Sequence, residues 1–362
     1  MNRLTCLILI SLAVAAAQDR TVVLRGSLHP RAQARFDQGR ADAAMPISYA
    51  TIHLQTGPGL EAFLDDVQNP RSANYHRWLS PEEFGNRFGA NASDLAKVTS
   101  WLQGAGFQVH DVARGRHWIT FSGTAGQVNR AFRTEIHRYL VNGRQHFANA
   151  TEIAIPEDLS AVVAGVRGLD DFRLEPQATG RGGARGLAPD DLATIYNLKK
   201  LYDAGIDGTG QIIAILGQTR ILLSDIQKFR KVYNLPPNDP KLTLFGADPG
   251  TVSGDFTEAE MDVEWSGAVA RNATINYVYS SDVFTSAEYA VDQNLAHVMS
   301  LSYGGCESYN PASFRAVAQQ ANAQGITWLV SSGDSGGRRL RFGRYNGGSD
   351  TGTDGGVPGQ PA

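Results

Sequence analysis

Between Leu192 and Ser332, short apolar runs alternate with longer amphipathic segments, and this alternation restricts the possible folds more than any other feature of the chain. Strands and helices that alternate in this way predict a parallel β-sheet covered by helices on both faces. The expected strands are 211–217, 274–280, 297–303 and 326–332, and the expected helices are 223–233, 258–270, 286–295 and 312–323. Ligands of such sheets bind at the carboxyl ends of the strands. Two segments that follow strands should therefore lie at that edge, Ser302-Tyr303-Gly304 and Gly333-Asp334.

A different order of elements precedes this sheet, between about residues 20 and 172. The expected strands are 47–54, 107–112, 118–122 and 135–140, and the expected helices are 59–69, 94–104 and 125–132. A further helix should begin at Pro81, because Ser80 is placed to cap it and Glu83 stands at its third position. This order of strands and helices predicts a ferredoxin-like α+β domain.

The two units are separated by residues 173–189, which are rich in glycine, proline and arginine and show no apolar period. Such a composition predicts an exposed linker. Exposed linkers are also where proteolysis concentrates, so we expect the chain to be cut within 173–189.

The N-terminus is typical of a secretory signal peptide, 1–17. Arg3 precedes an apolar run that ends in Ala15-Ala16-Ala17, and this run is too short to span a bilayer stably. We therefore expect a secreted protein that is not held in a membrane. The formal net charge of −3 gives no indication of nucleic-acid binding. Cys306 would be the single cysteine of the mature chain, and a buried, unreactive role is its simplest interpretation.

Two acids in the expected helix 258–270, Glu258 and Asp262, are placed unusually. Four residues apart, they lie about 40° apart around a helix axis. The same side carries apolar residues, namely Met261, Trp265, Ala268 and Val269, while Glu260 and Glu264 point elsewhere. Thr257 and Glu260 match a capping box, which leaves the other two acids unexplained. Carboxyl groups half-buried side by side raise or lower each other's pKa and share a proton, which is how a carboxylate becomes a useful base.

These residues resemble the motifs of the sedolisin, or serine-carboxyl peptidase, family, and of its kumamolisin-like members in particular. The family pattern is a helical Glu-x-x-x-Asp, here Glu258 and Asp262, followed by an aspartate in a Ser-Gly-Asp-Ser-Gly turn, here Asp334. The Ser-Leu-Ser-Tyr-Gly-Gly segment at 300–305 also matches. The string from Tyr75 to Phe84, Tyr-His-Arg-Trp-Leu-Ser-Pro-Glu-Glu-Phe, resembles the activation prodomain of the same family. The resemblance extends from about residue 20 to residue 336.

The resemblance implies a zymogen with a subtilisin-like α/β peptidase domain. Residues 18–172 would be the activation prodomain and an intramolecular inhibitor, and 190–336 the N-terminal part of the peptidase, so that its sheet is incomplete. Glu258 would be the general base for a serine nucleophile and Asp262 would orient it. Asp334, protonated in an acidic medium, would supply the oxyanion hole. The backbone of Ser302, Tyr303 and Gly304 would pair with an extended peptide or protein substrate. The full-length family also binds calcium, and those ligands would lie beyond Ala362.

Other chemistries fit the chain poorly. A Ser-His-Asp peptidase needs a histidine, and His297, inside an apolar strand, is the only one after the linker. The strand that ends at Gly217 also lacks an aspartate at its tip. No His-x-x-x-His or paired-cysteine spacing indicates a metal site, and Gly208-Thr-Gly210 lacks the rest of a phosphate-binding motif.

The family's Gly-Thr-Ser nucleophile segment does not occur in the 362 residues. Residues 337–362 hold eight glycines and four arginines and no apolar period, so they are either an exposed tail or the product of a shifted reading frame. If the reading frame is shifted by one nucleotide, codons that encode residues 337–342 can instead encode Ala-Ala-Asp-Cys-Asp-Ser, and the new cysteine would offer Cys306 a disulfide partner. The sequence thus predicts a secreted endopeptidase precursor of acidic pH optimum without its nucleophile. The alternative is an inactive truncated homologue, or an inhibitor or binding protein that works through its prodomain.

Overall fold

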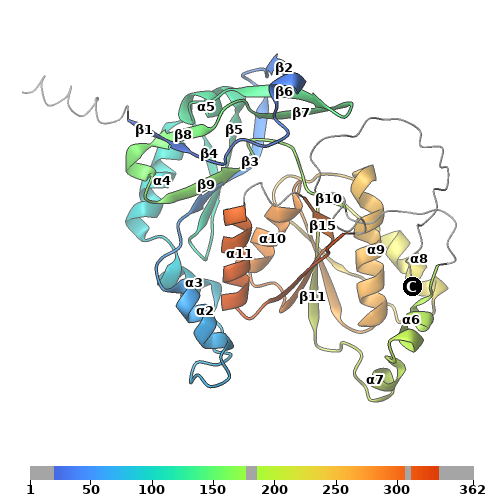
Figure 1. Cartoon of the computed structure of the whole chain (residues 1–362). Coiled ribbons are helices and arrows are strands. Elements are labelled where there is room, and N and C mark those ends of the chain that lie inside the picture. The colour runs from blue at the N-terminus through green and yellow to red at the C-terminus, as the bar shows by residue number, and fades with distance from the viewer. Residues whose placement is uncertain (1–19, 177–185, 306–310, 334–362) are drawn as a thin grey trace, which may run out of the picture.

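The computed structural model describes residues 20–176, 186–305 and 311–333. Several sequence predictions lie outside these residues: the signal peptide 1–17, most of the linker, Cys306, Asp334 and the tail 337–362. The described residues form two units, drawn from blue to green and from yellow to red in Figure 1.

The C-terminal unit is built on a five-stranded sheet with the order β12-β13-β11-β14-β16, in which all the pairs are parallel. The strands are β11 (Ile212–Gly217), β12 (Lys241–Leu244), β13 (Thr274–Tyr279), β14 (Val298–Leu301) and β16 (Thr327–Val330). The helices that follow them are α8 (Leu223–Val232), α9 (Ser253–Val269), α10 (Val283–Asp292) and α11 (Pro311–Ala323). The predicted strand 297–303 is divided, because Ser302 separates β14 from the short strand β15 (Tyr303–Gly304).

The helices cover both faces of this sheet, as predicted. Side chains of β11 alternate between the faces: Ile215 packs with residues of α8 and α9, whereas Ala214 and Leu216 pack with residues of α10 and α11. Figure 1 shows α10 and α11 on one side of the sheet and α9 on the other. Two shorter helices, α6 (Pro189–Ile195) and α7 (Lys199–Asp203), precede β11 and were not predicted. The edge strand β12 was also missed, because its four residues are mostly exposed and carry no clear apolar period.

The predicted start of the helix at residue 258 was wrong. α9 begins at Ser253, and its N-cap is Val252. Thr257 and Glu260 therefore lie inside the helix and do not form the predicted capping box. The Glu260 carboxylate instead accepts a hydrogen bond from the backbone N–H of Leu222, at 3.3 Å.

The N-terminal unit contains a four-stranded antiparallel sheet with the order β4-β5-β3-β9, which is the strand order of the predicted ferredoxin-like domain. Its strands are β3 (Pro46–Leu54), β4 (Gln108–Val112), β5 (Trp118–Thr124) and β9 (Val163–Arg167), and its helices are α2 (Leu60–Gln68), α3 (Pro81–Phe88), α4 (Ala92–Gly104) and α5 (Ala125–Ala131). The Ser80–Glu83 capping box at the start of α3 is present as predicted. Smaller strands extend the unit: β1 (Thr21–Leu24), β2 (Asp37–Arg40), β6 (Ile136–Val141), β7 (Arg144–Asn149) and β8 (Ile153–Pro156).

The N-terminal unit packs on α10 and α11 of the other unit. The backbone N–H of Leu79 donates to the carbonyl of Ala323 at 2.9 Å, just before α3. Asp292, at the end of α10, accepts hydrogen bonds from the backbone N–H groups of Arg114 and Gly115 at 3.0 and 2.8 Å. Figure 1 shows α2 and α3 beside α11.

A second connection lies where the chain leaves the N-terminal unit. The two-residue strand β10 (Glu175–Pro176) pairs antiparallel with β15, with Glu175 opposite Gly304 and Pro176 opposite Tyr303. The first residues of the predicted linker thus lie along the Tyr303-Gly304 segment. None of the helices in the described ranges has the length and the apolar character that a membrane span requires.

Candidate active site

The acid pair predicted from the sequence lies on the buried face of α9. Glu258 is 5% exposed and Asp262, one turn later, is partly buried. The neighbouring helix residues Ala259 and Val263 pack into the core against β11 and β13, and this packing fixes the rotation of α9. The negative charge of Glu258 acts on Asp262 and contributes to the raised pKa of that residue. The structure therefore brings the two acids together, as the spacing predicted.

Asp262 is held by Ser302, which lies between β14 and β15. The Ser302 hydroxyl donates a hydrogen bond to Asp262 Oδ1 at 2.9 Å. The other oxygen, Oδ2, is buried and has no hydrogen-bond partner among the described residues. Burial, together with the charge of Glu258, raises the pKa of Asp262 to about 7, and the Ser302 hydrogen bond opposes this rise. Asp262 can therefore hold a proton over the acidic range. The sequence indicated a backbone role for Ser302 and did not predict this side-chain contact.

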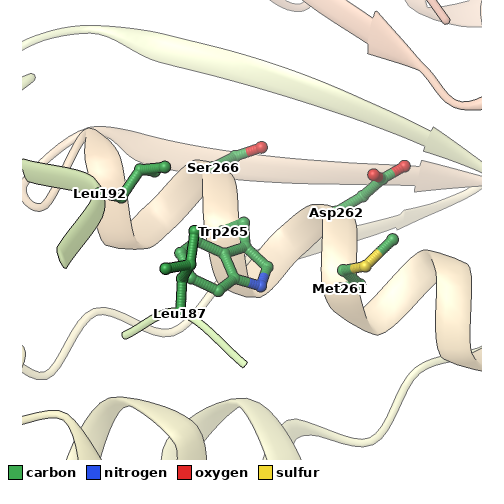
Figure 2. Close-up of a pocket in the computed structure, with 6 residues that line it drawn as sticks. All are labelled: Leu187, Leu192, Met261, Asp262, Trp265 and Ser266. Carbon is green, nitrogen blue, oxygen red and sulfur yellow. The ribbon is translucent and has the colours of Figure 1, made fainter. Parts of the chain in front are cut away.

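An open pocket of about 460 Å³, lined mainly by apolar side chains, lies next to Asp262. In Figure 2, Met261 and Asp262 are neighbours on α9, Trp265 lies about one turn away, and Leu187 and Leu192 stand beside Trp265. Of the four apolar residues that the sequence placed on the side of the acids, Met261 and Trp265 line this pocket, whereas Ala268 is buried in the core and Val269 is exposed. Two further acids of the helix, Glu260 and Glu264, are also partly buried and not fully solvated. Burial, followed by the charges of Glu260 and Asp225, raises the pKa of Glu264 to about 7.

A third acid on the same face, Asp255, was missed by sequence reasoning. It is 7% exposed and lies three residues before Glu258, so its spacing could have revealed it. Burial raises its pKa, and a hydrogen bond from Gln218 Nε2 at 3.0 Å opposes the rise. Gln218, which directly follows β11, also donates from Nε2 to the carbonyl of Leu174 at 2.9 Å. Asp255 and Gln218 therefore connect α9 to the segment that leads into β10.

The predicted substrate-binding residues lie at the carboxyl end of β14, as expected from their place in the sequence. Tyr303 is 1% exposed, its hydroxyl has no hydrogen-bond partner among the described residues, and burial raises its pKa. Its backbone and that of Gly304 pair with β10. Ser302, Tyr303 and the acids of α9 therefore occupy one region of the sheet edge.

A metal is not part of this arrangement. Among residues 20–176, 186–305 and 311–333, no group of three or more histidine, cysteine, aspartate or glutamate side chains is placed to hold a metal ion.

Comparison with known proteins relates the chain to one group of peptidases. Residues 34–172 match the family model described as "Pro-kumamolisin, activation domain". Xanthomonalisin from Xanthomonas sp. (strain T-22) is 29% identical over 338 residues, which cover 82% of this chain and 40% of that protein. Sedolisin from Pseudomonas sp. (strain 101) is 27% identical over 79% of this chain and 53% of its own length. Kumamolisin from Bacillus sp. (strain MN-32) is 27% identical over 88% of this chain and 62% of its own length. The chain spans about half the length of the curated relatives that it matches.

Proposed function

Because this chain is a kumamolisin-like protein of the sedolisin family with an activation domain at residues 34–172, we propose that it is the precursor of a serine-carboxyl endopeptidase. The observation that carries the proposal is the Glu258–Asp262 pair, which is buried against the sheet and held by Ser302 next to the strand edge of Tyr303 and Gly304. Two neighbouring carboxyl groups with a shared proton are suited to act as a base.

In the proposed mechanism, ionised Glu258 takes the proton of a serine hydroxyl as that oxygen attacks the peptide carbonyl. Asp262 Oδ2, which has no hydrogen-bond partner among the described residues, would carry the proton, donate it in a hydrogen bond to Glu258 and keep Glu258 oriented, as an aspartate does for histidine in a serine protease triad. Because the pKa of Asp262 is about 7, it holds its proton below neutral pH and can donate this hydrogen bond. Asp334 donates to the oxyanion only when it is protonated, so we expect an acidic pH optimum.

The same proposal gives the prodomain an inhibitory role. A substrate that pairs with the backbone of Tyr303 and Gly304 would need the edge that β10 occupies in this chain. Cleavage within 173–189 would separate β10 from the peptidase unit and free this edge. The signal sequence 1–17 supports secretion of the precursor.

The printed sequence contains no Gly-Thr-Ser segment. Residues 1–362 alone should therefore be inactive, and the activity would belong to a polypeptide that also carries this segment and the calcium site of the family. The second candidate is a protein that works as an inhibitor through its prodomain. Its support is that the N-terminal unit has its own core and docks on α10 through hydrogen bonds to the Asp292 carboxylate, and on α11 through the Leu79–Ala323 backbone hydrogen bond.

The test is to express the polypeptide of this locus in a form that includes the Gly-Thr-Ser segment, and to measure whether it hydrolyses peptides. After activation, its rate on an internally quenched peptide should be highest in acid, and Glu258→Gln should reduce it about 10³-fold or more. Glu264→Gln, on the same helix but outside the pair, is the matched control and should retain activity. Full activity in Glu258→Gln, or an optimum above neutral pH, would refute the proposal. If the locus encodes no such serine in any frame, the inhibitor is the remaining candidate.

A further inference from the structure

The segment before the linker is bound to the peptidase unit in the manner of a peptide ligand. Glu175 and Pro176 pair antiparallel with Gly304 and Tyr303, as an added strand does in peptide recognition. Only backbone groups take part in such pairing, so it gives affinity with little selectivity. Selectivity comes from the side-chain contacts of the bound segment, and the residue that makes them here is Leu174.

The backbone of Leu174 is anchored by a rigid donor. Gln218 is 2% exposed, and its Nε2 donates to the Leu174 carbonyl at 2.9 Å. The amide group of Gln218 is held in place by two further hydrogen bonds: Nε2 donates to Asp255 Oδ1 at 3.0 Å, and Oε1 accepts from the backbone N–H of Val283 at 3.2 Å. A donor fixed in this way does not have to be ordered when a peptide carbonyl arrives, which favours binding.

The side chain of Leu174 occupies a place that the peptidase unit shapes for it. It packs against the core cluster that contains Val283, Phe284 and Tyr303. Gly305 forms another wall, because a Cβ atom at this position would lie only 2.7 Å from Leu174 Cδ2. The absence of a side chain at residue 305 therefore makes the room that a leucine-sized group needs.

We propose that the place occupied by Leu174 is a subsite of the mature peptidase for peptide substrates, and that it accepts an aliphatic side chain of about the size of leucine. Gln218 anchors the carbonyl of the residue bound there, Asp255 positions Gln218, and Gly305 sets the size limit. The prosegment fills this subsite until it is removed. The proposal rests on the proposed function for the nature of the ligand, but binding at the subsite needs no serine nucleophile.

The first test uses the chain as it is, with its own prosegment as the ligand. Leu174 is replaced by methionine, valine, alanine or aspartate, and hydrogen exchange of the Gly304 amide, which faces β10, reports how often β10 leaves β15. Opening should be about tenfold more frequent in Leu174→Ala than in the unchanged chain, since a half-buried side chain loses its methyl groups. Among the four variants, opening should be most frequent with aspartate or alanine at position 174, less frequent with valine and least frequent with methionine. Gly305→Ala should increase opening when residue 174 is leucine and have little effect in the Leu174→Ala chain. Equal opening in all four variants would overturn the proposal.

The second test measures a peptide in trans. Fluorescein-labelled peptides Arg-Xaa-Glu-Pro, where Xaa is leucine, alanine or aspartate, are titrated into the Leu174→Asp chain, and fluorescence polarisation is recorded. The leucine peptide should bind about tenfold more tightly than the alanine peptide, and Gln218→Leu in the same chain should weaken it. If Leu174→Asp does not fold, the Leu174→Ala chain takes its place.

A preference for leucine in cis with no preference in trans would mean that the site serves only the prosegment, and this result would also overturn the proposal. Failure of the complete polypeptide to hydrolyse peptides would instead contradict the proposed function, because neither binding test depends on catalysis.

Discussion

Replacement of Asp262 by asparagine should stabilise this chain at alkaline pH. The pKa of Asp262 is about 7 in the folded protein and 3.8 ordinarily. An acid with a raised pKa holds its proton more tightly in the folded state than in the unfolded state. The resulting cost to stability is absent below pH 3.8, grows as the pH rises, and is complete above about pH 7. Asparagine has nearly the same shape, keeps an oxygen that can accept from Ser302 and carries no charge, so Asp262→Asn removes this cost.

The size of the effect follows from the same values. The difference between 3.8 and about 7 corresponds to roughly 4 kcal/mol. Because the side chain is only partly buried, solvent reduces this value, and we expect a gain of about 2–4 kcal/mol at pH 8. Urea unfolding, followed by tryptophan fluorescence at pH 4 and pH 8, measures it. Asp203→Asn, an exposed acid on α7, is the control and should change stability by less than about 0.5 kcal/mol. No gain in Asp262→Asn at pH 8, or the same gain at pH 4, would refute the reasoning.

One further prediction concerns the contact between the two units, and another concerns a buried histidine of the N-terminal unit. Gly325→Ala should lower the free energy of unfolding by about 2 kcal/mol or more, because Gly325 has a φ of +74° and an added Cβ would lie 2.6 Å from the ring of Trp78. Urea unfolding measures this loss. The control is Gly104→Ala, at an open helical site with no neighbour within 4 Å, which should not lower the free energy of unfolding. His117 is 1% exposed, and burial lowers its pKa from 6.5 to about 4. The unfolded chain therefore takes up the proton first, and the wild-type chain should lose about 3 kcal/mol through this residue as the pH falls from 6.5 to 4. In His117→Gln, the free energy of unfolding should fall less between pH 6.5 and pH 4, by the amount attributed to His117. If this pH dependence is the same as in the wild-type chain, His117 is not its cause.

Most of the fold could be predicted from the sequence because the strongest signals are local. The alternation of apolar strands and amphipathic helices after residue 192 predicted the parallel sheet, and Ser80 with Glu83 fixed the start of α3. Prediction failed where the local signal was weak or shared. β12 has mostly exposed side chains and therefore no apolar pattern. Thr257 and Glu260 match the sequence of a capping box, although both lie inside the longer helix α9.

The candidate site shows the same limit. The spacing of Glu258 and Asp262 was sufficient to place them together, because residues four apart share one helix face. The contacts made by Ser302, Gln218 and Leu174 cross between elements that are distant in the sequence. No periodicity reports such contacts, so they required the three-dimensional structure.

The central claim is that Glu258 activates a serine nucleophile. The most direct measurement is the reaction of the activated, Gly-Thr-Ser-containing polypeptide with a peptide aldehyde in acidic buffer, with the modified residue identified in a crystal structure of the hemiacetal adduct. The account predicts an adduct on the serine of Gly-Thr-Ser that forms at least about a hundredfold more slowly in Glu258→Gln. An adduct on another residue, or an equal rate in Glu258→Gln, would contradict it.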